Sequence, residues 1–85
     1  MTKKILKSAS TTNVNKLGAA IISQINEGNF VQLQAVGAAA VNQAVKSVIA
    51  ANRIYGGEII MRPSFGNSNT KEGHYCINFE LEVIE

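Results

Sequence analysis

The feature that most constrains the fold is a hydrophobic period that changes repeatedly along the chain. Segments whose apolar residues recur at steps of three and four predict amphipathic helices, and segments in which apolar and polar residues alternate predict strands with one buried face. Two further short strands are predicted, at residues 4–9 and at about 59–65. The predicted elements are strands at 4–9, 30–35, about 59–65 and 74–83 and helices at 13–27 and 39–54.

This order, β-α-β-α-β-β, predicts an α+β fold with two layers, in which a mixed four-stranded sheet carries both helices on one face. The first two strands, joined by a helix, are expected to be parallel, and the last two to form an antiparallel hairpin around the turn residues 66–73. Pro63 lacks an amide hydrogen and therefore suits an edge strand. With 85 residues, the chain is expected to form a single domain, residues 1–85.

Side-chain parity divides the predicted sheet into a core face and a wet face. The wet face is expected to carry polar residues, namely Gln32, Gln34, Asn78, Glu80 and Glu82. Phe65, Tyr75 and Phe79 have core parity, so the exposed aromatic candidate for base stacking is Tyr55. Glu80 and Glu82 are either solvated or paired with Lys3, Lys4 and Lys7 of the first strand.

Small residues inside the predicted helices indicate close packing. Gly18 costs about 1 kcal/mol relative to alanine in a helix, so a close approach to another element is expected there. The same expectation holds for the run Ala38-Ala39-Ala40. Asn13 and the Ser and Thr residues before it supply oxygens that can cap the first helix, and Gly28 suits its end.

Composition narrows the classes of function. One cysteine, Cys76, and one histidine, His74, fall short of a zinc site, and the pair lacks an orienting acid for nucleophilic catalysis. Neither GxxxxGK nor GxGxxG occurs. The chain is therefore expected not to be an enzyme and to need no metal or cofactor. Without a signal peptide or membrane span, it is expected in the cytoplasm.

Charge is unevenly distributed although the net charge is only +2. Residues 1–53 carry six lysines and arginines against one glutamate, whereas residues 54–85 carry two against five glutamates. This asymmetry fits a basic face for an anionic partner, one end of a domain that meets its neighbour, or ordinary solvated charge.

A family resemblance appears in residues 36–46, VGAAAVNQAVK, which closely resemble the strand-to-helix signature of the stage V sporulation protein S family. Residues 15–21 resemble that family's first helix, and Glu27-Gly28 its end; the similarity runs over about 5–84. The resemblance implies a two-layer Alba-like domain, a homodimer and a role in endospore development. Alba domains bind DNA or RNA, but the loop 8–13 lacks lysine and arginine, and Ala38 stands where Alba commonly has a cation.

Two functions follow as alternatives. The first is a small nucleic-acid-binding regulator of bacterial sporulation that contacts the phosphate backbone through the helix starts and through the arm, residues 62–73. The second is a protein interaction module in sporulation that binds no nucleic acid. For the first, the candidate contacts are the cations Lys16, Lys46, Arg62 and Lys71 and the neutral groups at Thr11, Asn13, Gly37 and Asn42.

Overall fold

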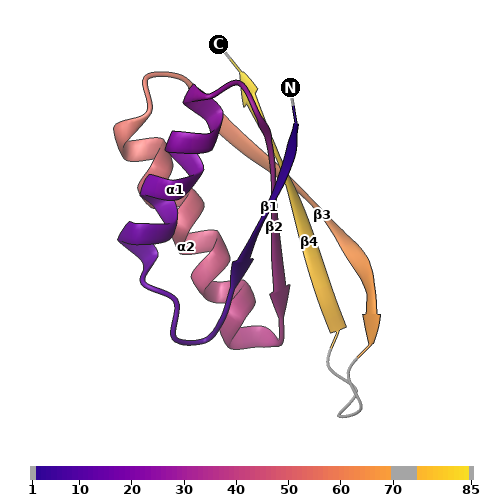
Figure 1. The fold of residues 1–85 in the computed structure, drawn as a ribbon. Helices are drawn as coiled ribbons and strands as arrows, with labels where there is room; N and C mark the ends of the chain where they lie inside the picture. Colours follow the sequence, from indigo (N-terminus) through magenta and orange to yellow (C-terminus); the bar gives the residue numbers. More distant parts are fainter. Residues whose placement is uncertain (1, 70–74, 85) are drawn as a thin grey trace.

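The computed structural model describes residues 2–69 and 75–84. The predicted α+β fold and its β-α-β-α-β-β order are confirmed (Figure 1). The six elements are β1 (Lys3–Ser8), α1 (Val14–Asn26), β2 (Phe30–Val36), α2 (Ala38–Ile54), β3 (Glu58–Asn69) and β4 (Tyr75–Ile84).

The sheet has the strand order β1-β2-β4-β3. β1 pairs with β2 in parallel and β3 with β4 antiparallel, as expected, and β4 also pairs antiparallel with β2. β3 is an edge strand, so the missing amide hydrogen of Pro63 is tolerated. Both helices cover the same face of the sheet (Figure 1), which leaves the opposite face, here called the open face, without a covering layer.

The predicted ends of the elements hold to within one or two residues except at β3. The sequence predicts that a turn begins at Gly66, but β3 continues to Asn69 through an irregularity between Phe65 and Asn69. Gly66 is needed for this path because a Cβ there would lie 2.6 Å from the Cys76 sulfur. The rest of the predicted turn, residues 70–73, lies outside the described residues.

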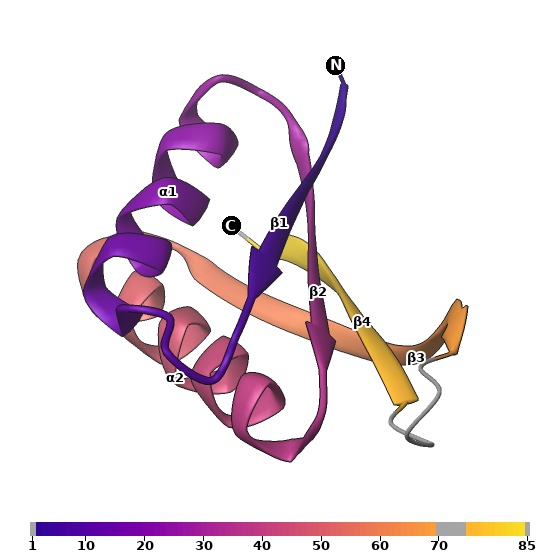
Figure 2. The same ribbon diagram turned by 60° about the horizontal axis from the view of Figure 1, so that its bottom comes forward.

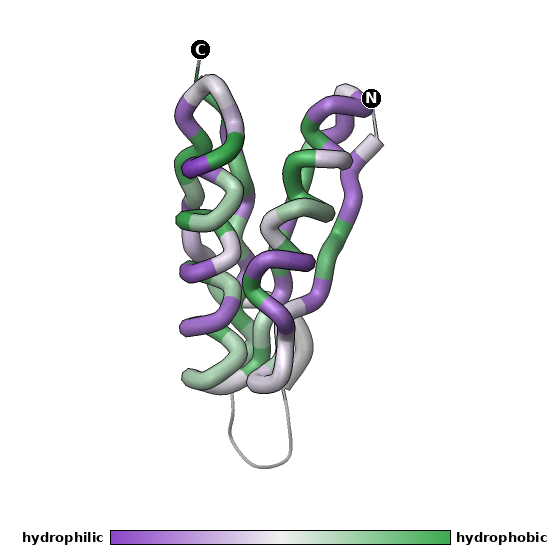
Figure 3. Tube along the Cα trace, turned by 90° about the vertical axis from the view of Figure 1, so that its left-hand side faces the viewer, coloured by the Kyte–Doolittle hydropathy of each residue, from purple (hydrophilic) through white to green (hydrophobic). Residues whose placement is uncertain are grey.

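The core lies between the helix pair and the sheet. Figure 3 looks onto the helix layer and shows the two helices side by side in front of the strands. The members of the core are Leu17, Ile21, Val31, Leu33, Ala35, Ala40, Ala44, Val48, Ala51, Ile59, Phe79 and Leu81. Gly18 lies where the helices touch, since a Cβ there would be 3.1 Å from the Ser47 carbonyl oxygen and 3.2 Å from the Ala50 Cβ. The expected close approach is thus confirmed. For the alanine run it holds at Ala40 alone, because Ala38 and Ala39 are exposed.

Side-chain parity predicts the face of the sheet correctly but not always the burial. Phe79 is 5% exposed as expected, whereas Phe65 and Tyr75 are 73% and 65% exposed, so the core assignment of these two is wrong. The hairpin end of β3 and β4 diverges from α1 and α2 (Figure 2), and neither of these helices covers that part of the sheet.

The open face also departs from expectation at two positions. Gln32 is 6% exposed because it lies on the central strand β2, between Ile5 of β1 and Glu80 of β4. The Lys3 ammonium lies 3.6 Å from the Glu80 carboxylate across β2, so of the two alternatives for Glu80, solvated or paired with the first strand, the structure shows the pair. Cys76 is buried as well, against Gly66.

Candidate nucleic-acid interface

One end of the molecule collects the starts of both helices and the carboxyl ends of β1 and β2. We call it the helix-start end, residues 7–13 and 36–40 (Figure 2). The Gln43 amide on α2 donates a hydrogen bond of 2.9 Å to the Thr12 carbonyl oxygen, which fixes the loop before α1 against α2. The two helix starts are therefore held together by the tertiary fold.

α2 starts at this end without a side-chain cap. Its N-cap residue, Gly37, has φ 89° and ψ 159°, a region that essentially glycine alone adopts, and it makes no side-chain hydrogen bond. The first bond of the helix runs from the Val41 amide to the Gly37 carbonyl oxygen at 3.0 Å. Amides of the preceding turn, residues 38–40, have no partner within the helix, and that turn contains no acidic residue.

α1 starts with a side-chain cap instead. The Asn13 Oδ1 atom accepts a hydrogen bond from the Lys16 amide at 3.0 Å, and the Thr12 Oγ1 atom accepts one from the Ala9 amide at 2.7 Å. The first bond confirms the expected cap at Asn13, whereas the second lies in the loop before the helix and caps no amide of α1. Because the carboxamide oxygen of Asn13 is occupied in this way, its NH₂ group is the part left to meet a ligand.

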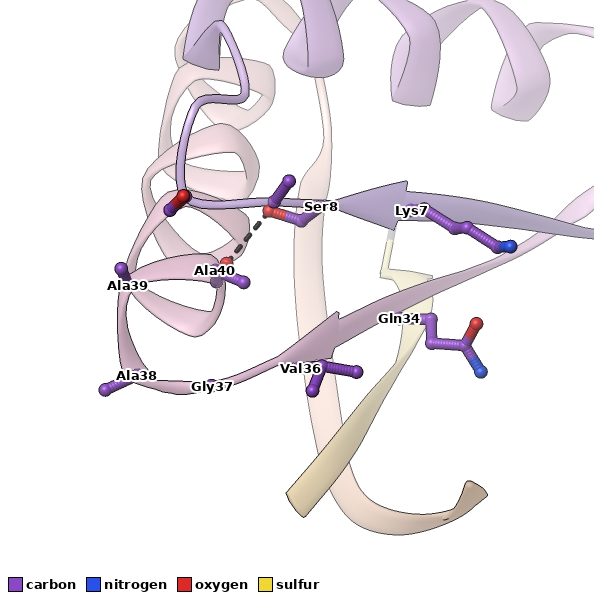
Figure 4. Close-up of a pocket in the computed structure, with 10 residues that line it drawn as sticks. Lys7, Ser8, Gln34, Val36, Gly37, Ala38, Ala39 and Ala40 are labelled. Carbon is purple, nitrogen blue, oxygen red and sulfur yellow. Dashed lines mark hydrogen bonds between the residues drawn. The ribbon is translucent and has the colours of Figure 1, made fainter. Parts of the chain in front are cut away.

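A surface hollow of about 630 Å³ lies between the ends of β1 and β2 and the start of α2. Lys7 and Gln34, paired in the β1–β2 register, project from adjacent strands at its rim (Figure 4). The buried Ser8 hydroxyl donates to the Ala40 carbonyl oxygen at 2.9 Å and ties β1 to α2. The described residues that line this hollow include a lysine and no acid.

The structure brings some of the predicted contact residues together and separates others. Thr11, Asn13 and Gly37 lie at the helix-start end, and Lys16 is in the first turn of α1. Asn42 and Lys46 are exposed one turn apart on α2, further from the start of that helix. Arg62 lies on the open face, where its guanidinium forms an ion pair with Glu82. Lys71 lies outside the described residues.

Lys7 lines this hollow and is not among the contact residues that the sequence predicts. It was considered only as an ion-pair partner for the glutamates of the last strand. The available signal was the predicted parallel pairing of the first two strands, because the carboxyl ends of parallel neighbours meet at one edge of a sheet. That pairing places Lys7 beside Gln34, three residues before Gly37.

A family model described as stage V sporulation protein S (SpoVS) matches residues 4–83. The chain belongs to the stage V sporulation protein S family. Its role is accordingly related to sporulation. The signature segment of the family, residues 36–46, forms the end of β2, the Gly37 turn and the first half of α2, so it lies at the helix-start end. A search of curated proteins found no match.

Other candidate chemistry in this member of the family is limited. Cys76 is buried, and its thiol donates to the Asn78 Oδ1 atom at 3.8 Å, while His74 lies outside the described residues. Within residues 2–69 and 75–84, no group of three or more His, Cys, Asp or Glu side chains is placed to hold a metal ion. The helices of the described chain are too short or too polar to cross a membrane.

The aromatic side chains are placed differently from the prediction. Tyr55 is half-buried beside the core and packs over Gly57, where a Cβ would lie 3.1 Å from the Tyr55 ring. Phe65 and Tyr75, by contrast, are exposed, and their ring centroids are 5.3 Å apart with an interplanar angle of 47°. The exposed aromatic side chains are therefore Phe65 and Tyr75 of the β3–β4 hairpin and Phe30 of β2, and not Tyr55.

Proposed function

We propose that this protein is a cytoplasmic, dimeric, nucleic-acid-binding regulator of sporulation with no catalytic activity of its own. It contacts the phosphate backbone at the helix-start end and along the arm. The observation that carries the proposal is the hollow between β1, β2 and α2, which is lined both by Lys7 and by residues 38–40 with their uncapped amides. Backbone amides at a helix start and the positive end of the helix dipole both attract a phosphate.

The distribution of acids supports this location. Glu27 follows α1 and Glu58 begins β3, both at the end of the molecule opposite to the helix-start end (Figure 1). Glu80 and Glu82 lie on the open face, each in an ion pair with a basic residue. A phosphate that approaches the start of α2 meets Lys7 and amides, and the described lining contains no carboxylate to repel it.

A salt titration tests the proposal. Non-specific affinity for nucleic acid comes largely from the release of counterions, and a dissociation constant of about 10⁻⁴–10⁻⁶ M is typical at physiological salt. With about three phosphate contacts on duplex DNA, affinity should fall about 40-fold between about 50 and 200 mM salt. Fluorescence anisotropy with labelled duplex and single strands measures this, and no binding at low salt contradicts the proposal.

Lys7→Gln sharpens the test at the helix-start end. It should reduce the salt dependence by about one phosphate contact and weaken binding to every sequence alike. Lys3→Gln is the matched control on the same face of the same strand, because the Lys3 ammonium is already paired with Glu80. An equal loss for both variants would show that general charge, and not the helix-start end, determines the affinity.

The arm is tested separately with Arg62→Ala combined with Lys71→Ala. Arg62 is exposed and is not a member of the core cluster, so the melting temperature should change little while affinity for all sequences falls. Glu82→Gln, which frees Arg62 from its ion pair, should raise affinity instead. Full-strength binding by the double variant would remove the arm from the proposed interface.

The alternative function, assembly with a protein, has one observation in its favour. Four large apolar side chains are exposed on strands of the open face or at its ends: Ile5, Phe30, Val36 and Ile84. An assembly module predicts a stable dimer in solution scattering together with no nucleic-acid binding at low salt. The two functions are therefore separated by the same pair of measurements.

A further inference from the structure

The hairpin end of β3 and β4 carries an aromatic pair, Phe65 and Tyr75, that neither helix covers. Both rings point to the helix side of the sheet by parity, yet the hairpin diverges from the helices, so both remain largely exposed (Figure 2). Pro63, Phe65 and Ile77 also line an apolar hollow of about 320 Å³. The result is a continuous apolar surface in which aromatic rings, and not aliphatic groups, are the most exposed part.

This surface is joined directly to the start of α2. The Gly37 amide donates a hydrogen bond of 3.4 Å to the Tyr75 carbonyl oxygen, and Val36 pairs with Cys76 in the β2–β4 register. The backbone of Tyr75 is therefore hydrogen-bonded directly to the Gly37 turn. The amides proposed to hold phosphate, those of residues 38–40, follow this turn. A nucleic-acid strand with one phosphate at residues 38–40 therefore has its adjacent nucleotides close to the hairpin.

The size and charge of the surface indicate its occupant. A stable protein interface takes about 20–30 residues on each side, far more than these four residues provide. A flat aromatic ligand needs only a ring face, and stacking on exposed rings is the general way in which proteins hold unpaired bases. The described residues that line this hollow and the one beside α2 include no acid, so a phosphate backbone is not repelled.

We propose that Phe65 and Tyr75 stack on unpaired bases, so that the protein binds single-stranded nucleic acid in preference to duplex. The inference rests on the proposed function, because it assumes that phosphate lies at the helix-start end. Bases in a duplex are already stacked and do not offer their faces to the hairpin. Stacking alone does not distinguish DNA from RNA, and the test includes both.

The experiment measures anisotropy at low salt with four labelled probes of equal length: oligo-dT, oligo-U, a duplex, and an abasic deoxyribose-phosphate strand. The single strands should bind about tenfold more tightly than the abasic strand if one base is stacked. In Phe65→Leu with Tyr75→Leu, this advantage should disappear, while binding to the duplex and the abasic strand stays unchanged. Phe30→Leu is the control, because Phe30 is a comparably exposed aromatic on the open face.

A second readout reports contact with Tyr75 itself. The chain has two tyrosines and no tryptophan, so Tyr55→Phe leaves Tyr75 as its one tyrosine emitter. Oligo-dT should quench this emission, and the abasic strand should not. The melting temperature of each variant checks that the fold is intact, which is expected because both hairpin rings are exposed.

The outcomes separate the inference from the function on which it rests. No binding of any probe would overturn both. Salt-dependent binding of duplex and abasic strands with no preference for bases would overturn the stacking role and leave the phosphate role in place. An unchanged single-strand preference in the double leucine variant overturns the stacking role as well, and a loss of dimer mass in that variant would then assign the aromatic pair to a contact between two copies.

Discussion

α1 begins with a side chain that caps it, whereas α2 begins with a glycine that makes no such bond. Asn13 satisfies one first-turn amide of α1 from within the chain, at 3.0 Å from the Lys16 nitrogen. Gly37 offers no side chain, and its backbone conformation suits the turn from β2 into α2. A first-turn amide of α1 is therefore satisfied by a side chain of the protein, whereas the first amides of α2 are left to water or to an anion.

The largest effect should come from Gly37→Ala, which tests whether the backbone of the uncapped start is essential. At φ 89° and ψ 159° a Cβ is strained, and the free energy of unfolding should fall by about 2 kcal/mol, measured by urea denaturation. Gly56→Ala is the matched control, because no atom lies within 4 Å of its added Cβ and its φ is not positive. Equal unfolding midpoints for both variants would contradict the strained turn.

A smaller effect is expected from Asn13→Ala, which removes the cap of α1. The loss of the bond to the Lys16 amide should lower the free energy of unfolding by about 1 kcal/mol. Asn13→Ser should recover most of the loss, because serine is a comparable capping residue. Thr11→Ala in the same exposed loop should have little effect, and a cost at Thr11 equal to that at Asn13 would show that the loop, and not the cap, determines stability.

The smallest change in stability, with the opposite sign, is expected from Ala39→Asp. A carboxylate in the first turn of α2 interacts favourably with the helix dipole and should stabilise the fold by about 0.5 kcal/mol. It should also repel phosphate and weaken nucleic-acid binding. Asn15→Asp, at the second helical position of α1 as Ala39 is of α2, should stabilise the fold similarly but weaken binding less. Equal losses of affinity would show that the two helix starts contribute equally to nucleic-acid binding.

Much of the fold could be predicted from the sequence because local periodicity fixes it. The strands and helices occur where the hydrophobic period predicts them, and the cap at Asn13 and the positive φ of Gly28 follow from local residue chemistry. Burial was predicted less well. Phe79 and Phe65 share one face of the sheet, yet only Phe79 is covered by the helices. Parity states which way a side chain points, but the length and position of the opposite layer decide whether anything lies there.

The candidate site shows the same division. Gly37 and the start of α2 could be identified from the signature segment, whereas the contact of Lys7 with the same hollow depends on strand pairing. Arg62 looked like a free cation in the sequence, but the antiparallel register of β3 and β4 brings it within reach of Glu82. The sequence gives the number of charged residues. How many of those charges remain free to bind a ligand depends on the partners that the fold brings to them.

The sequence by itself determined the order of the elements, the core faces of β2, β3 and β4, the place where α2 starts and, through residues 36–46, the family. These depend on neighbours within a few positions along the chain, where period, propensity and capping act. The tertiary structure alone decided that Lys7 and Gly37 line one hollow, that Arg62 is paired, and that Phe65 and Tyr75 meet beyond the helix layer. Those contacts join residues distant in the chain, and they form only when the sheet is assembled and its hairpin diverges from the helices.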